Sequence, residues 1–293
     1  MKPIHTLCIG EILMDLLPSG ARLGGAPANV AWHANRFGAE SLIVSRIGSD
    51  PTGARILEQL KLMGMETKGI TTDDVHPTGQ VDVTVDDHGK PTYFIHEDTA
   101  WDFIELGPDV LKTAAHADAV CFGSLAQRSE VSRQAIQTLL AATSPDCLRF
   151  FDINLRQAYF SEGLITSSLK LANALKLNDE ELPILAKYYG LTGSDLEMAS
   201  ALAERFSLRL VALTRGSKGS LLLAGNETSE HPGCPTTVVD SVGAGDCFTA
   251  ATMVGFSAGK SLDEINEIAN QAAAFVCGSS GATPVLPEGW RIV

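Results

Sequence analysis

The 293 residues carry a net charge of −13 at neutral pH, with 45% hydrophobic and 19% charged side chains. This is the composition of a globular protein with a large core, and so acidic a chain is not expected to bind nucleic acid or an anionic membrane. The six cysteines form no CxxC pair, and neither a signal-peptide pattern nor an apolar run of about 18 residues is present, so we expect reduced thiols and a cytoplasmic location.

Short apolar runs alternate with helical patterns along most of the chain. The expected strands lie near residues 4–9, 41–47, 118–122, 148–152, 174–177 and 209–214. The expected helices lie near residues 26–37, 51–64, 129–142, 161–173, 194–206, 243–258 and 261–278. Asp50 and Pro51 supply the cap and first position of the second helix. This alternation predicts an α/β fold with a mostly parallel central sheet flanked by helices.

One stretch departs from this rhythm. The β-prone runs Thr78–Val85 and Thr92–Ile95 flank Asp86-Asp87-His88-Gly89, which predicts a hairpin. A hairpin within a βαβ series often forms an appendage beside the sheet, and one use of it is a lid over a site. Because no linker separates the two halves of the chain, we expect one main domain with a small lid.

The sharpest chemical signal is the heptapeptide Asp240-Ser-Val-Gly-Ala-Gly-Asp246, which follows the β-prone run 236–239 and begins a helix. A helix start exposes free N–H groups and a partial positive charge, and Gly243 and Gly245 allow phosphate oxygens to approach the backbone. Asp246 then lies where an attacking hydroxyl must lose its proton. The alternative is that Asp246 only caps a helix that glycine initiates.

Five segments, in this order, resemble the signatures of the ribokinase-like (PfkB) carbohydrate kinase family. They are Gly10–Asp15 (GEILMD), Gly24–Ala31 (GGAPANVA), Asn178–Glu181 (NDEE), Thr214–Gly216 (TRG) and Asp240–Asp246 (DSVGAGD). The resemblance covers nearly the whole chain. It implies a ribokinase-like fold, a central sheet with a small β lid, and an ATP-dependent enzyme that phosphorylates a sugar hydroxyl.

The resemblance also implies roles for single residues. Asp246 would be the catalytic base, and the backbone N–H groups of Gly243, Ala244 and Gly245 would form the anion hole. The residues expected to bind the sugar are Asp15, Gly24, Gly25 and Asn29. Arg156 could bind the carboxylate of a sugar acid, as could Arg22.

The nucleotide and metal residues come from later segments. The resemblance places four residues at ATP, namely Asn178, Thr214, Gly216 and Asn270. Glu181 would organise Mg²⁺ through water, as suits a hard cation that keeps its waters. Some members bind a monovalent cation such as K⁺, for which backbone oxygens near Asp240, Val242 and residues 277–282 could serve.

Several of these residues also have plainer interpretations. Asp15 could be an exposed aspartate at a strand end, Gly24-Gly25 a simple turn, and Asn178 with Glu181 an ordinary helix cap. Gly255–Ser261 (GFSAGKS) looks like a P-loop, but it is one residue short and follows a helix, so we expect a helix–helix connection.

The acceptor is the least determined feature. The strings GGAPAN and DINLR most resemble fructokinase-type members, which makes fructose the best expectation. Against fructose, the stretch 93–102 lacks the arginine that many such members carry in the lid hairpin. The lid, formed by parts of 11–23 and 78–103 in a single domain 1–293, is short, so a second subunit could complete it in a homodimer. The alternatives are a kinase for a 2-keto-3-deoxygluconate-type sugar acid, a nucleoside kinase, or a catalytically silent regulator that binds sugar or nucleotide.

Overall fold

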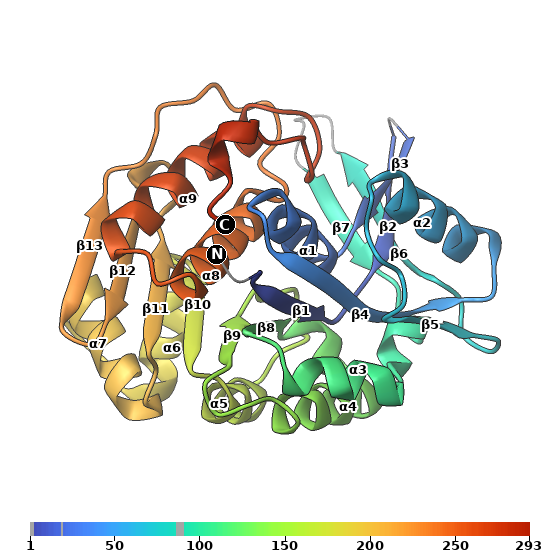
Figure 1. The fold of residues 1–293 in the computed structure, drawn as a ribbon, viewed down its shortest axis with the longest axis horizontal. Coiled ribbons are helices and arrows are strands. Elements are labelled where there is room, and N and C mark those ends of the chain that lie inside the picture. Colours follow the sequence, from blue (N-terminus) through green and yellow to red (C-terminus); the bar gives the residue numbers. More distant parts are fainter. Residues whose placement is uncertain (1–2, 19, 86–90) are drawn as a thin grey trace.

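The computed structural model describes residues 3–18, 20–85 and 91–293 (Figure 1). Its largest element is a nine-stranded sheet with the order β13-β12-β11-β10-β9-β8-β1-β4-β5. The pairings from β11 to β5 are parallel, and β12 and β13 are antiparallel additions. The strands are β1 His5–Ile9, β4 Glu40–Gly48, β5 Ile70–Asp73, β8 Ala119–Gly123, β9 Leu148–Asp152, β10 Ala174–Asn178, β11 Leu210–Thr214, β12 Ser220–Ala224 and β13 Glu227–His231. The expected α/β fold is confirmed.

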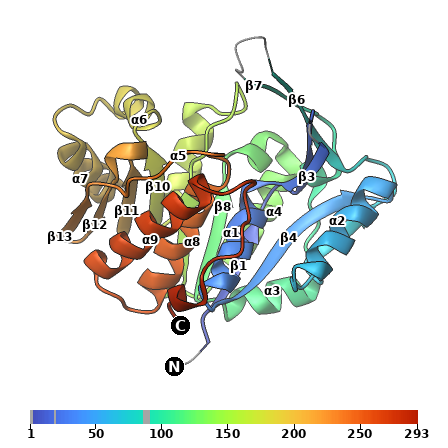
Figure 2. The same cartoon turned by 90° about the horizontal axis from the view of Figure 1, so that it is seen from above.

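Helices cover both faces of this sheet (Figures 1 and 2). The helices α1 (Ala26–Arg36), α8 (Ala244–Ser257) and α9 (Leu262–Cys277) pack together on one face. The other face carries α3 Pro108–Ala115, α4 Glu130–Ala141, α5 Glu162–Leu171, α6 Leu182–Tyr189 and α7 Asp195–Phe206. The remaining long helix, α2 (Pro51–Leu62), contacts β4 and the second sheet. Asp50 caps α2 as expected, because its side chain accepts a hydrogen bond from the Gly53 N–H at 2.8 Å.

Each face of the sheet has its own core. In β1, Leu7 and Ile9 belong to the core under α4 and α5, whereas Cys8 belongs to the core under α1, α8 and α9. Successive side chains of a strand point to opposite faces, so a parallel strand covered on both sides must be apolar throughout. A charged side chain inside such a strand is therefore unusual and requires a specific explanation.

A second sheet of four strands, in the order β3-β2-β6-β7, stands beside the first. Its strands are β2 Leu13–Leu17, β3 Gly20–Gly24, β6 Gly79–Val85 and β7 Pro91–Ile95. The pairing of β6 with β7 is antiparallel, which confirms the hairpin, although its expected turn at 86–89 lies outside the described residues. Figure 2 shows this hairpin projecting beyond the large sheet.

Some local expectations need correction. The β-prone run 236–239 forms no strand, and Val238 and Val239 are each 64% exposed, because this segment joins β13 to α8 without a partner strand; the Val239 N–H donates instead to the Cys277 carbonyl oxygen at the end of α9. Asp15 does not follow a strand but lies in the middle of β2. The P-loop-like stretch from Gly255 is the connection between α8 and α9, as expected.

Two further observations concern the class of protein. Of the helices in the described ranges, none combines the length and the apolar character that crossing a membrane requires. All six cysteines are free thiols.

Candidate active site

The candidate site lies at the carboxyl ends of the parallel strands. β1 pairs with β4 on one side and with β8 on the other, so the direction of chain progression reverses at β1. In open α/β sheets, ligands bind outside the carboxyl ends of the strands at such a reversal. Predicted residues gather at this edge, because Asn178 ends β10 and Thr214 ends β11.

The first turn of α8 and the residue before it form a glycine cradle, residues 243–245. Gly243 has a φ of +82°, and a Cβ atom there would overlap the carbonyl oxygen of Ala282, so no other residue fits. The Cys247 N–H donates to the Gly243 carbonyl oxygen at 2.8 Å, which leaves the earlier N–H groups outside the helical ladder. This backbone is suited to an anion.

Asp246 follows the cradle and contacts the other glycine-rich motif. Asn29 is buried in α1, and its Nδ2 donates a hydrogen bond to Asp246 Oδ2 at 2.8 Å. Burial and repulsion from Asp152 raise the pKa of Asp246 to about 6, against the opposing effects of Asn29 and nearby cations. At neutral pH the carboxylate is ionised, yet it is a stronger proton acceptor than an ordinary aspartate. Simple capping of the helix therefore does not account for its surroundings.

A second carboxylate, Asp15, lies beside one of the glycines expected at the acceptor. A Cβ atom on Gly24 would overlap Asp15 Oδ2, so the glycine makes room for this side chain. Gly25 has a φ of +107° and packs over the backbone of Glu11. Burial raises the pKa of Asp15 to about 6, and the Arg156 guanidinium opposes that rise. The charge of the exposed Arg156 also lowers the pKa of Asp246. Its guanidinium therefore acts on both carboxylates, and the three groups form one electrostatic neighbourhood.

The structure adds Glu11 to this neighbourhood, a residue to which the sequence motifs assign no role. Its side chain is buried, and its Oε2 has no hydrogen-bond partner within the described part of the chain. Burial raises the pKa of Glu11 to about 7, with a further contribution from Asp246. A glutamate between a buried strand and a glycine motif was the available signal.

The residues predicted to bind the nucleotide form a row that begins on three neighbouring strands. Asn178 of β10 is in register with Thr214 of β11, which is in register with Ser220 of β12. Asn270 of α9 completes the row, because its Nδ2 donates to Ser220 Oγ at 2.7 Å. Gly216, exposed and with a φ of +54°, follows Thr214 in the connection to β12.

Asn178 and Glu181 contact each other as a capping pair. Asn178 Oδ1 accepts the Glu181 N–H at 2.8 Å, and Glu181 Oε2 accepts the Asn178 N–H at 2.8 Å. Glu181 Oε1 also accepts the Leu155 N–H at 2.9 Å and so holds the loop that carries Arg156. The helix-cap interpretation is correct in part, since α6 begins only at Leu182 and the pair closes the turn before it.

The metal expectations can be tested against these donors. Each Glu181 oxygen accepts one N–H group and keeps further lone-pair capacity for a water molecule. Within the described ranges, no group of three or more His, Cys, Asp or Glu side chains is arranged to hold a metal ion. This donor set fits Mg²⁺ that is bound mainly by phosphate oxygens and water, with an indirect protein contact.

Asp240 lies where the segments expected around a monovalent cation meet. Its Oδ1 accepts the Val242 N–H, and its Oδ2 accepts the Gly281 N–H, each at 3.1 Å. Arg22 of β3 donates to the same Oδ2 at 3.3 Å. Arg22 therefore joins the small sheet to the loop before α8, and its guanidinium is engaged there.

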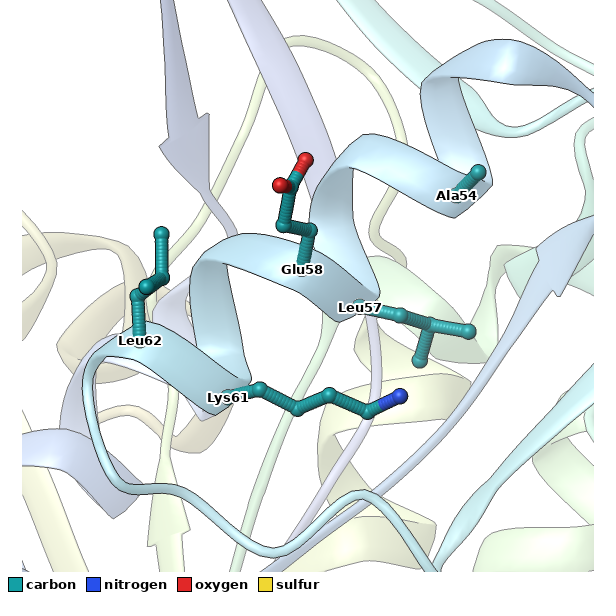
Figure 3. Close-up of a pocket in the computed structure, with 5 residues that line it drawn as sticks. All are labelled: Ala54, Leu57, Glu58, Lys61 and Leu62. Carbon is teal, nitrogen blue, oxygen red and sulfur yellow. The ribbon is translucent and has the colours of Figure 1, made fainter.

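A surface hollow elsewhere has no part in this site. Figure 3 shows the five side chains that line it, all from α2: Ala54, Leu57, Glu58, Lys61 and Leu62. None of them is a predicted site residue, so the chemistry at the strand ends is the stronger indication of function.

Comparisons with known sequences agree on one family. The model described as pfkB family carbohydrate kinase matches residues 20–289. A fructokinase of Escherichia coli is 30% identical over 297 residues, and the match covers 95% of this chain and 95% of that protein.

Solved structures give the same result. An uncharacterized sugar kinase of Pyrococcus horikoshii in complex with ATP matches with a TM-score of 0.81 and 29% identity, over 96% of this chain and 94% of that one. A Vibrio cholerae fructokinase double mutant, with fructose, ADP and potassium ion bound, matches with a TM-score of 0.78 and 25% identity, over 97% and 95% of the two chains.

Replacing Glu11 by glutamine should stabilise the protein above neutral pH. The pKa of Glu11 rises from 4.5 to about 7 on folding, so native protein binds the extra proton and stability falls as pH rises through this window. Glutamine stays neutral and keeps an acceptor oxygen. In urea unfolding, we expect Glu11→Gln and the parent to be nearly equal at pH 4.5 and the variant to gain up to about 3 kcal/mol at pH 8.

The matched control is Glu58→Gln, on the exposed face of α2. It should change stability by less than about 0.5 kcal/mol at either pH. If Glu11→Gln shows no gain between pH 4.5 and pH 8, Glu11 is not a desolvated carboxylate.

Proposed function

The chain belongs to the pfkB family of carbohydrate kinases, and we propose that it transfers the γ-phosphoryl group of ATP to a hydroxyl group of fructose. ATP-dependent phosphorylation of a sugar follows from the family match. Fructose is the finer proposal. It is supported by the relatives named fructokinase in Escherichia coli and Klebsiella pneumoniae and by the Vibrio cholerae enzyme that holds fructose and ADP.

One observation carries the proposal. The hydrogen bond from Asn29 to Asp246 joins the two glycine-rich motifs, which lie 217 positions apart in the sequence. Asn29, which is suited to a sugar hydroxyl, thereby lies beside the Asp246 carboxylate, whose pKa is raised. Asp246 in turn lies at the start of α8, where the backbone is suited to phosphate. Phosphoryl transfer requires this combination of positioning and charge neutralisation.

In the proposed mechanism, the acceptor lies between Asp15 and Asp246. Asp15, the backbone at Gly24 and Gly25, and Asn29 orient the sugar, while Arg156 contributes a cation at the same place. Asp246 accepts the proton of the attacking hydroxyl. The N–H groups of the glycine cradle, Gly243 to Gly245 with Ala244 between them, stabilise the charge on the transferred phosphoryl group.

The nucleotide would lie along the row of Asn178, Thr214, Gly216 and Asn270. Glu181 would order water around Mg²⁺, which neutralises charge on the phosphate oxygens when it is bound. Beside the cradle, backbone oxygens near Asp240 and Val242 could hold K⁺, the ion present in the Vibrio cholerae structure.

We extend the proposal to the small sheet as the lid of a single domain, 1–293, built from parts of 11–23 and 78–103. The sheet carries Asp15 and approaches the loop after β9, since Gln157 Nε2 donates to the Tyr93 carbonyl oxygen at 2.8 Å. Tyr93 and Phe94 on the hairpin are 46% and 63% exposed, and a second copy that covers them would give a homodimer through the lid.

The use of ATP supports the cytoplasm as the compartment.

An acceptor panel tests the substrate. ADP release should be measured with Mg-ATP and fructose, other hexoses, a 2-keto-3-deoxy sugar acid and nucleosides. We expect fructose to give the highest kcat/KM, by at least about tenfold, because a site built for particular hydroxyl groups rejects acceptors that leave its polar groups unpaired. Preference for a sugar acid or a nucleoside would contradict fructose, and ATP binding without any phosphorylation would favour the silent regulator.

The proposed role of Asp15 at the acceptor site is tested by a substitution at its neighbour Gly24. Gly24→Ala adds a Cβ atom that must displace the Asp15 carboxylate, so the acceptor KM should rise while the ATP KM stays near that of the parent. A hydrogen bond to a charged group contributes about 1.5–3 kcal/mol, which sets the rise at roughly tenfold to 150-fold. Gly107→Ala is the control, since no atom lies within 4 Å of its added Cβ. An unchanged acceptor KM in Gly24→Ala would remove Asp15 from the acceptor site.

A further inference from the structure

A lysine stands in the middle of a central strand, between apolar neighbours. Lys176 lies in β10 between the fully buried Leu175 and Leu177. Its own side chain is buried as well, and its Nζ donates a hydrogen bond to Asp152 Oδ1 at 3.1 Å. Removing an ammonium group from water is costly even when a partner compensates its charge, so packing alone does not account for this residue.

Asp152 connects this lysine to helix α8. It ends β9 in register with Lys176, and its second oxygen accepts a hydrogen bond from Thr249 Oγ1 at 2.7 Å. Thr249 is buried and follows Asp246 by three residues, so the two side chains lie on neighbouring turns of one helix face. The contacts therefore run from the central strand to the turn that carries the proposed base.

The ammonium group also lies against the backbone of the glycine cradle. A Cβ atom on Gly245 would stand 3.4 Å from Lys176 Nζ. In a poorly solvated region such a charge acts on its neighbours with little screening. The same ammonium attracts the carboxylates of Asp246 and Glu181, which belong to the catalytic and the nucleotide parts of the site.

We propose that Lys176 is a positioning residue for phosphoryl transfer, which holds the first turns of α8 through Asp152 and Thr249 and balances the negative charge at Asp246. The proposal rests on the assignment of Asp246 as the general base. Lys176 does not itself contact the acceptor. Its effect is to fix where the base lies and how strongly the base holds a proton.

Several elements contribute to the charge balance at Asp246. Asn29 of α1 donates the hydrogen bond, and the titratable groups that act on Asp246 or respond to it are Glu11, Cys121, Asp152, Arg156, Lys176 and Cys247. Burial and Asp152 raise the pKa of Asp246, whereas Lys176 and Arg156 lower it. Loss of Lys176 must therefore raise the pKa of Asp246, and loss of Asp152 must lower it.

The test is the pH profile of kcat/KM for Lys176→Met and Asp152→Asn, with Mg-ATP and the best acceptor. The acid limb of the parent should lie near pH 6, the pKa of Asp246. It should move up by about one pH unit in Lys176→Met and down by a similar amount in Asp152→Asn. In Lys176→Met, kcat should also fall roughly tenfold to 100-fold, because the first turns of α8 lose a tether.

The chain offers a matched control in a second buried ion pair. Arg128 and Asp102 have side chains that are 8% and 5% exposed, the same values as Lys176 and Asp152. Arg128→Met should destabilise the protein as a broken buried pair does, and it should leave the acid limb where it is in the parent.

The outcomes that overturn the proposal are distinct. Folded single variants whose acid limbs do not move, or move in the same direction, would make Lys176 a purely structural residue. If circular dichroism shows that a single variant does not fold, the neutral double variant Lys176→Met/Asp152→Asn decides, because it leaves no uncompensated buried charge. We expect it to lose at least about tenfold in kcat, and a parent-like kcat would overturn the proposal.

Failure of the proposed function is recognised separately. Acceptor-dependent ADP release by the parent tests the kinase activity without any variant. A parent profile with no acid limb near pH 6 would remove Asp246 as the base, and this proposal with it.

Discussion

As the proposed base, the carboxylate of Asp246 must lie beside a helix end suited to phosphate and still accept a proton. The field of the α8 N-terminus and the hydrogen bond from Asn29 favour the ionised form. Burial and the charge of Asp152 favour the protonated form, and the resulting pKa of about 6 lies between the two extremes. If the helix field and Asn29 dominated, the pKa of Asp246 would be low and the carboxylate would be a weak base. If burial and Asp152 dominated, Asp246 would be protonated at neutral pH. The placement of α8 therefore determines the chemistry.

The fold supplies that placement through its parallel sheet. β1, β9, β10 and β11 end at one edge, and the segments that follow them carry the side chains of the site. Two cores of buried apolar side chains hold this edge from both faces, which fixes α1 and α8 against each other. Motifs far apart in the chain therefore meet at hydrogen-bond distance, and the small sheet adds Asp15 from a third direction.

The features that could be predicted depend on local backbone requirements. The cap at Asp50, the hairpin of β6 and β7, and the glycine at 243 each follow from what a turn or helix end demands of its own residues. The remaining features depend on which strands become neighbours. The hydrogen bonds that Lys176 and Thr249 both make to Asp152, the burial of Glu11 and the row that ends at Asn270 arise only when distant elements are assembled, among them β9 to β12, α8 and α9. A lysine inside an apolar strand was a visible signal, but its partner was not.

The measurement that tests the account most directly is kcat beside calorimetric ATP affinity for Asp246→Asn. Asparagine preserves the shape of the side chain and the glycine cradle but cannot accept the proton. The account predicts that kcat falls by about 10²–10⁴-fold. ATP binding should stay near that of the parent, because the backbone N–H groups remain. A folded Asp246→Asn protein that turns over within about threefold of the parent would contradict the account and move the search to another carboxylate.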